Sequence, residues 1–101
     1  MKASDGRMVR YLAPGESPAA LTEDRIRRLF RDYVCEVSAN ESLVVVKTLP
    51  GAAQGVASGL DHAGWPEILG TVAGDDTIFV AVRSQKLVPA LKKRLAALLE
   101  G

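Results

Sequence analysis

The stretch Gly70-Thr71-Val72-Ala73-Gly74-Asp75-Asp76-Thr77 lies between two apolar runs, residues 65–69 and 78–82. Two short apolar runs with turn-forming residues between them predict a pair of antiparallel strands, with this octapeptide as their connection or as their inner ends. Adjacent carboxylates repel each other and are costly to bury without a cation, so Asp75 and Asp76 indicate either a solvated hairpin turn or a site for a positive group. A guanidinium suits such a site best, because its planar fork can pair bidentately with a carboxylate.

The rest of the chain supplies elements that pack around this pair of strands. In chain order we expect a helix over residues 22–33, strands over 33–37 and 43–46, a helix over 50–63, and the strands over 65–69 and 78–82. A last helix follows, which Ser84 can cap and which has Pro89 in its first turn. This order predicts an α+β fold, a two-layer sandwich in which helices pack on one antiparallel four-stranded sheet.

Residues that start and stop helices set the expected boundaries. Thr22 is an N-cap residue, and Glu23 and Asp24 after it carry the negative charge that suits the start of a helix. Pro50 fits the first position of the second helix, and Gly64 fits the residue just beyond its end. The turn between the first two strands is expected over residues 38–41.

The helix expected over residues 50–63 separates apolar from polar side chains. Its core stripe consists of Val56, Ala57, Leu60 and Ala63, and its polar stripe consists of Gln54, Ser58 and Asp61. Gly55 and Gly59 each weaken a helix by roughly 1 kcal/mol relative to alanine, so we expect both to permit close packing against a neighbour. Because the helix dipole disfavours a carboxylate near the C-terminal end, Asp61 should be screened by solvent or have a cationic partner.

The composition is typical of one soluble globular domain. The chain has 101 residues, of which 48% are hydrophobic and 25% are charged, so we expect a packed core and no disorder or membrane span. It carries 13 basic and 12 acidic residues, a formal net charge of +1, which predicts weak or no DNA binding by this chain. The arginines of the 22–33 helix are accordingly expected to lie on a solvated face.

Cysteine and histidine are each present once. Cys35 excludes an intrachain disulfide, suits a reducing compartment, and stands in an apolar run that predicts a buried structural thiol. His62 lacks a second histidine or cysteine with which to form a metal site, so we expect it at the surface. Met1 is followed by Lys2-Ala3-Ser4-Asp5-Gly6 rather than by an apolar run, so we expect no signal peptide and a cytoplasmic protein.

Three separated motifs point to a known family. The first is Lys47-Thr48-Leu49-Pro50-Gly51-Ala52-Ala53-Gln54. The second is one residue, Asp61, and the third is residues 68–78, which contain the Gly-Thr-Val-Ala-Gly-Asp-Asp-Thr signature. In this order and spacing they closely resemble the C-terminal domain of bacterial arginine repressors, over about residues 21–100. The stretch Arg7-Met8-Val9-Arg10-Tyr11-Leu12-Ala13-Pro14 further resembles the end of that family's winged helix-turn-helix. The resemblance implies a fragment in which residues 1–20 are the tail of the DNA-binding domain and a linker, and residues 21–101 are the oligomerisation and L-arginine-binding domain.

The resemblance also implies how such a domain would act. It would form trimers that stack in pairs as a hexamer, bind L-arginine as corepressor at the trimer–trimer interface, and serve the regulation of arginine metabolism genes. Operator DNA would be bound only through the missing N-terminal domain, and no other cofactor, metal, catalytic residue or membrane is implied. By position, the ligand contacts of the family fall on Gln54, Asp61, Thr71, Ala73, Asp75 and Asp76.

Within that set, the chemistry of each group suggests its part. Asp75 and Asp76 are expected to take the guanidinium, one of them from the opposite trimer, and Asp61 to face the α-ammonium group. Backbone N–H groups near Thr71 and Ala73 are expected donors to the α-carboxylate.

Two other functions fit part of the pattern. A small α/β enzyme of pterin dehydratase-like shape would need a proton-transfer group in a pocket, usually a histidine, and this chain offers only His62. A magnesium- or calcium-binding module would use Asp61, Asp75 and Asp76, because hard cations prefer carboxylate oxygens. Calorimetry with arginine and with metal would separate these hypotheses.

Overall fold

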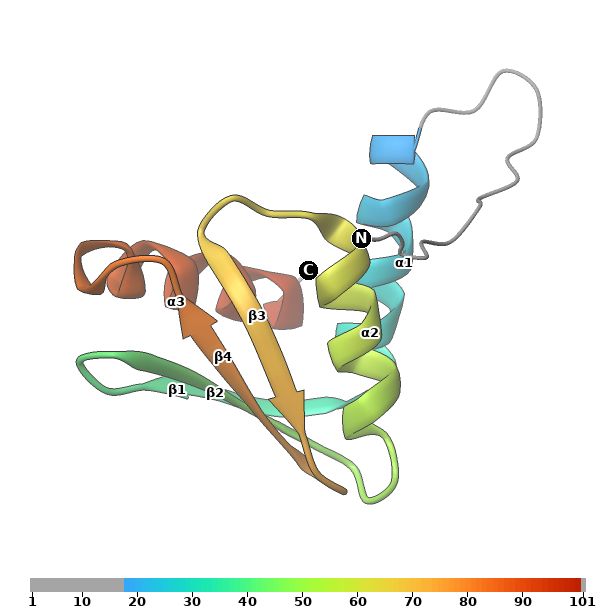
Figure 1. Ribbon diagram of the computed structural model, residues 1–101. Coiled ribbons are helices and arrows are strands. Elements are labelled where there is room, and N and C mark those ends of the chain that lie inside the picture. Colours follow the sequence, from blue (N-terminus) through green and yellow to red (C-terminus); the bar gives the residue numbers. More distant parts are fainter. Residues whose placement is uncertain (1–17, 101) are drawn as a thin grey trace, which may run out of the picture.

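The computed structural model describes residues 18–100 (Figure 1). Its elements are α1 (Pro18–Tyr33), β1 (Val34–Ala39), β2 (Leu43–Thr48), α2 (Ala53–Ala63), β3 (Ile68–Ala73), β4 (Thr77–Val82), the 3-10 helix η1 (Gln85–Leu87) and α3 (Val88–Glu100). The predicted α+β class and the order of helices and strands are confirmed. The stretch over residues 7–14 lies outside the described residues. None of the described helices is both long enough and apolar enough to span a membrane.

The four strands form one antiparallel sheet in the order β1-β2-β4-β3. The central strands β2 and β4 join the two hairpins, with Val44 opposite Val80 and Val46 opposite Ile78. Helix α3 packs on β1 and β2, α2 packs on β3 and β4, and α1 contacts both of these helices. The sheet and the helices are therefore two layers, and the strand side chains that alternate toward the helices make the core.

The core contains most of the side chains that the helical and strand periodicity selected. Ile26 and Phe30 of α1 are fully buried, as are Leu91 and Leu95 of α3. The predicted stripe of α2 is confirmed, since its buried members are Val56, Ala57 and Leu60, with Ala63 packed partly buried at the edge. The arginines of α1 from residue 25 onward are exposed, as expected of a solvated face.

Two predicted boundaries near the N-terminal half were wrong. Helix α1 begins at Pro18 rather than at Thr22, because proline has the backbone angle of a helix and needs no hydrogen bond in the first turn. Strand β1 continues to Ala39, so the turn is shorter than residues 38–41. It is made by Asn40, whose Oδ1 accepts hydrogen bonds from the main-chain N–H groups of Ser42 (2.9 Å) and Leu43 (2.8 Å).

The predicted start of the second helix at Pro50 was also wrong, since α2 begins at Ala53. Leu49 O accepts a hydrogen bond from Ala52 N at 3.1 Å, and Gly51 has φ of 82°. Proline followed by a glycine with positive φ is typical of a type II turn, which occupies residues 49–52 and delays the helix to Ala53. The predicted end is confirmed, since Gly64 caps α2 with φ of 66°.

Three packing predictions had different outcomes. Gly59 does permit close packing, because a Cβ built there would lie 2.6 Å from Leu29 Cδ1. The prediction that Gly55 permits close packing was wrong within the protomer, since nothing lies within 4 Å of a Cβ built at Gly55. Cys35 is exposed rather than buried, because β1 is an edge strand and its pairing with β2 is irregular between Val34 and Glu36.

The later boundaries also shift. Strand β3 begins at Ile68, so Trp65 is a buried loop residue instead of the start of a strand. The octapeptide forms the inner ends of both strands and their connection, which is one of its two predicted roles, because β3 runs on to Ala73 and β4 begins at Thr77. Residues 85–87 form a 3-10 turn before α3, Ser84 makes no side-chain capping bond, and Pro89 lies in the first turn of α3 as expected.

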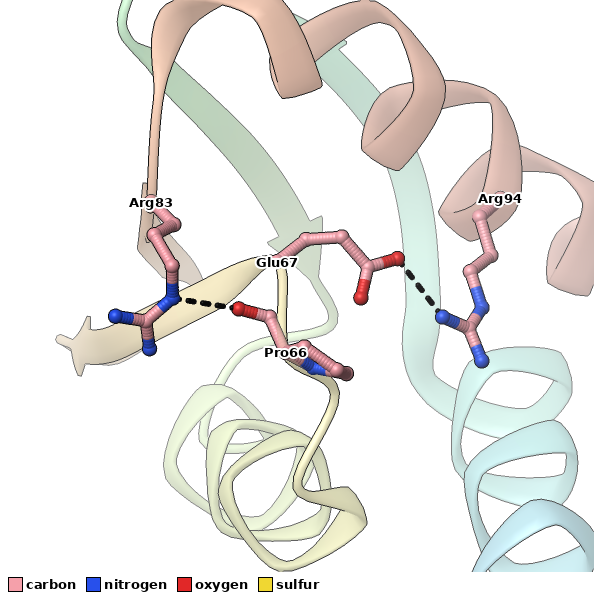
Figure 2. Close-up of polar contacts among 4 residues, drawn as sticks. All are labelled: Pro66, Glu67, Arg83 and Arg94. Atoms are coloured by element: carbon pink, nitrogen blue, oxygen red, sulfur yellow. Dashed lines mark hydrogen bonds and ion pairs between the residues drawn. The ribbon is translucent and has the colours of Figure 1, made fainter.

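A polar cluster ties the loop between α2 and β3 to the rest of the fold (Figure 2). Arg94 of α3 forms an ion pair with Glu67 at 2.8 Å, and its guanidinium carbon lies 3.5 Å from the centre of the Trp65 ring. Arg83 donates from Nε to the Pro66 carbonyl oxygen at 2.8 Å. The pKa of the Glu67 carboxyl is lowered, first by a main-chain hydrogen bond, with partial burial opposing, and then by Arg94.

Candidate ligand-binding site

The paired carboxylates lie at the tip of the β3–β4 hairpin. Gly74, Asp75 and Asp76 connect the strands, and Gly74 N donates to Thr77 O at 2.9 Å to close the turn. Both aspartates are exposed, and neither forms an ion pair with another residue of the range 18–100. Within the described residues the turn is therefore exposed to solvent, and its two carboxylates are not neutralised by an ion pair.

Main-chain hydrogen bonds hold this tip against the loop before α2. The Asp75 carbonyl oxygen accepts from Gly51 N at 3.1 Å and from Ala53 N at 3.2 Å, and the Asp76 carbonyl oxygen accepts from Thr48 N at 2.8 Å. The loop offers these donors because Gly51 adopts a left-handed conformation that other residues rarely adopt. These bonds thus fix the main chain of both aspartates.

A second polar pair joins α2 to β3, which run side by side in Figure 1. Thr71 donates from Oγ1 to Asp61 Oδ1 at 2.9 Å. Asp61 is exposed in the last turn of α2, so solvent screens it and a hydroxyl, rather than a cation, is its partner. This contact brings together two of the predicted ligand residues.

A third grouping lies beside the hairpin tip. An open hollow of about 330 Å³ is lined by Gly51, Gln54, Gly74 and Asp75. Its volume is at the lower end of the ~300–1,000 Å³ range of small-molecule sites. Ala73, the remaining predicted residue, packs its side chain against the core, so only its main chain is available to a ligand.

A larger hollow of about 450 Å³ is also lined in part by Gly51. Its lining is mostly apolar and includes Leu29, Tyr33, Leu49 and Val56, and it contains none of the six predicted residues. The size of a hollow alone therefore does not identify the ligand site, and the paired carboxylates at the hairpin tip indicate its place better.

Comparison with known proteins identifies the family. Residues 30–97 match the model of the arginine repressor C-terminal domain. The chain belongs to the arginine repressor family.

Three relatives illustrate the similarity. The arginine repressor of Desulforudis audaxviator is 74% identical over 101 residues, which are 100% of this chain and 67% of that protein. The arginine repressor of Pelotomaculum thermopropionicum is 51% identical over 92 residues, 91% of this chain and 61% of the relative. That of Symbiobacterium thermophilum is 50% identical over 95 residues, 94% of this chain and 62% of the relative. The chain thus spans about two thirds or less of the length of these curated relatives.

Membership of the arginine repressor family settles the enzyme alternative. Arginine repressors are transcriptional regulators, so this is a domain of a regulator rather than an enzyme. His62 is exposed, as expected, and its Nδ1 lies 2.8 Å from Ser58 O of the same helix. Among the described residues no three histidine, cysteine or acidic side chains are grouped to hold a metal ion, so the protomer does not form the alternative site of Asp61, Asp75 and Asp76.

Sequence reasoning missed several residues around the arginine repressor signature. Gly51 holds the hairpin tip through its N–H group, and its signal was the Pro50-Gly51 dipeptide, which is typical of a turn. The Thr77 side chain donates to Asp76 at the tip and accepts from Lys47, and no spacing rule links this pair because the two residues are 30 positions apart. Only the pairing of β2 with β4 places them opposite each other.

Proposed function

We propose that this domain binds L-arginine as a corepressor at a trimer–trimer interface and mediates hexamer assembly, within a cytoplasmic repressor of arginine metabolism genes. In this proposal residues 21–101 form the binding and oligomerisation domain, and residues 1–20 belong to the tail of the DNA-binding domain and the linker. The observation that carries it is the exposed pair Asp75 and Asp76, whose backbone is tied to the loop before α2 while neither carboxylate forms an ion pair with another residue of the range 18–100.

The geometry supports a ligand with charges at both of its ends. Asp75 and Asp76 supply negative charge for a guanidinium, which a planar fork can match with two hydrogen bonds. Asp61 lies at the opposite end of α2 from Gln54, about 10 Å along the helix axis, and is available to an α-ammonium group. The main chain of Thr71 and Ala73 passes between these ends and can donate to an α-carboxylate.

The open face of the sheet supports assembly. Phe79 lies opposite Val72 on β3 and opposite Val45 on β2, so the three side chains form an apolar row across the strands. Val72 is 72% exposed and Phe79 is 50% exposed. Soluble proteins seldom leave such an apolar row exposed to water, so we infer that other copies of this domain pack against it.

Charge explains why arginine would control assembly. A hexamer without ligand would gather the aspartate pairs of six protomers near one interface, and their repulsion would loosen it. Each guanidinium inserted between them removes that repulsion, so arginine binds the tight hexamer better than the free trimer and shifts the population. DNA binding belongs to the N-terminal domain in this proposal, because a net charge of +1 offers few phosphate contacts.

Calorimetry with matched ligands tests the proposal. L-Arginine should bind, L-citrulline should fail because it has the shape without the charge, and L-lysine should bind poorly because its ammonium cannot make the planar contact. Light scattering on the same samples should show that arginine raises the fraction of hexamer. Equal binding of citrulline and arginine, or heat from magnesium and none from arginine, would contradict the proposal.

A further inference from the structure

A chain of side-chain hydrogen bonds runs from β2 to the hairpin tip. Lys47 and Thr77 are cross-strand partners on β2 and β4. Lys47 donates from Nζ to Thr77 Oγ1 at 3.0 Å, and Thr77 donates from Oγ1 to Asp76 Oδ1 at 2.9 Å. No group of this chain other than Thr77 is within hydrogen-bond reach of the Asp76 carboxylate in the described range.

The direction of this chain follows from the chemistry of its members. An ammonium group can only donate, so Lys47 must occupy a lone pair of the Thr77 oxygen. The single hydroxyl proton of Thr77 is then free to point to the carboxylate, which can only accept when ionised. Hydrogen bonds arranged in one direction polarise each other, and those to charged groups are the stronger ones.

This arrangement restricts Asp76 in two ways. Its main chain is held by Thr48 N, and one carboxylate oxygen is held by Thr77. The second oxygen carries no hydrogen bond from the described chain and is available to a ligand. A carboxylate that is already oriented loses less side-chain freedom when a guanidinium binds, and that saving appears as affinity.

We propose that Thr77 is a positioning residue for the corepressor site, with Lys47 as its donor: together they orient the Asp76 carboxylate for the guanidinium. The inference rests on the proposed function, because it assumes that Asp76 contacts L-arginine. It adds two residues that do not themselves touch the ligand. Lys47 also keeps a positive charge near the aspartate pair of the same protomer without forming an ion pair within 4 Å.

The test compares two substitutions at one position. Thr77→Val keeps the branched shape that suits a strand and removes the hydroxyl, whereas Thr77→Ser keeps the hydroxyl. L-Arginine titrated by calorimetry into the full chain should bind Thr77→Val on the order of tenfold more weakly than wild type, as expected for loss of a hydrogen bond to a charged group. Thr77→Ser should bind like wild type, and both variants should keep the wild-type thermal unfolding midpoint.

Two further variants separate positioning from a general effect on the hairpin. In an Asp76→Ala background, Thr77→Val should cause no additional loss of arginine affinity, because no carboxylate remains to be oriented. Lys47→Met should weaken arginine binding less than Thr77→Val does, since Thr77 can still donate without it. Tighter binding by Lys47→Met would overturn the role of Lys47, because it would show a cation that competes with the guanidinium.

The outcomes distinguish this inference from the proposed function. Wild-type protein that does not bind arginine would remove the proposed function and the inference together. Wild-type protein that binds arginine while Thr77→Val binds equally well, or while Thr77→Val and Thr77→Ser lose affinity equally, would overturn the positioning role alone. A Thr77→Val effect that persists in the Asp76→Ala background would overturn it as well.

Discussion

Asp76 combines an ordered backbone with an exposed charge. Its carbonyl oxygen accepts from Thr48 N, its carboxylate accepts from Thr77, and the side chain remains exposed. Such an exposed carboxylate contributes little to the stability of the protomer, so substitutions at Asp76 are suited to testing the proposed recognition of arginine.

Asp76→Asn should change arginine binding and assembly in opposite directions. Arginine affinity should fall by about 3 kcal/mol, because the change removes one partner of a charge pair that the proposed trimer–trimer interface would bury. The arginine-free hexamer should become more stable, since one repulsive charge per protomer is gone. Calorimetry and sedimentation velocity measure the two effects, and an Asp76→Asn protein with normal arginine binding or a weaker free hexamer would exclude this mechanism.

Glu67 should make the stability of the fold depend on pH. Because its folded-state pKa is lowered, its contribution to the free energy of unfolding is present above the usual value of 4.5 and is lost as the pH falls through the lowered value. Glu67→Gln should therefore lose less stability than wild type in urea unfolding between about pH 6 and pH 3, at one fixed protein concentration.

Arg94→Met is the matched comparison for Glu67→Gln. It should keep part of the wild-type pH dependence, because a main-chain hydrogen bond, the largest single cause of the lowered Glu67 pKa, remains when Arg94 is gone. A Glu67→Gln profile parallel to wild type would show that this carboxyl is not linked to folding.

At the scale of elements, α2 has two glycines with opposite surroundings. Gly59 faces α1, where Leu29 Cδ1 and Ile26 Cδ1 would lie 2.6 and 3.3 Å from an added Cβ. Gly55 has open space around it and lines the larger hollow. The same residue type thus serves close helix packing at one position and leaves the helix surface bare one turn earlier.

Alanine substitutions should separate these two glycines. Gly55→Ala should raise the free energy of unfolding by up to about 1 kcal/mol, because alanine is the better helix former. Gly59→Ala should lower the free energy of unfolding by about 1 kcal/mol. Moving the α1 side chains away from the new Cβ should cost more free energy than the better helix propensity of alanine contributes. Urea unfolding measures both, and destabilisation by Gly55→Ala would mean that this face of α2 is packed against another subunit.

At the scale of the whole molecule, the helices among residues 18–100 cover only one face of the sheet. Helices cover the inner face, and the row of Val45, Phe79 and Val72 crosses the outer face. A single layer of helices therefore leaves apolar surface that the proposed assembly would bury.

Light scattering should find this chain as an oligomer at micromolar concentration, and Phe79→Ser should shift it toward monomer. Leu49→Ser is the matched control, since Leu49 is 48% exposed against 50% for Phe79 but lies outside the sheet. It should leave the assembly unchanged. A monomeric wild-type chain, or equal dissociation by both variants, would contradict the assignment of the open sheet face to assembly.

The sequence alone determined the class of the fold, the order of its elements and most of its core. Local patterns suffice for these features, because helical and strand periodicities select the side chains that face inward. The octapeptide motif and its companions also identified the family, since they fall in one order along the chain. The six ligand positions came from that resemblance, and they remain predictions.

Only the tertiary structure decided how the hairpin tip is held. The donor Gly51 lies in the loop before α2, and the donor Ala53 is the first residue of α2. Their acceptor Asp75 lies more than 20 residues later, in the β3–β4 hairpin. Lys47 and Thr77 meet because β2 pairs with β4 rather than with β3. Cys35 is exposed for a similar reason, since the strand order places β1 at an edge. Pairing between distant strands depends on the whole packing of the chain, so no local pattern of residues encodes these contacts.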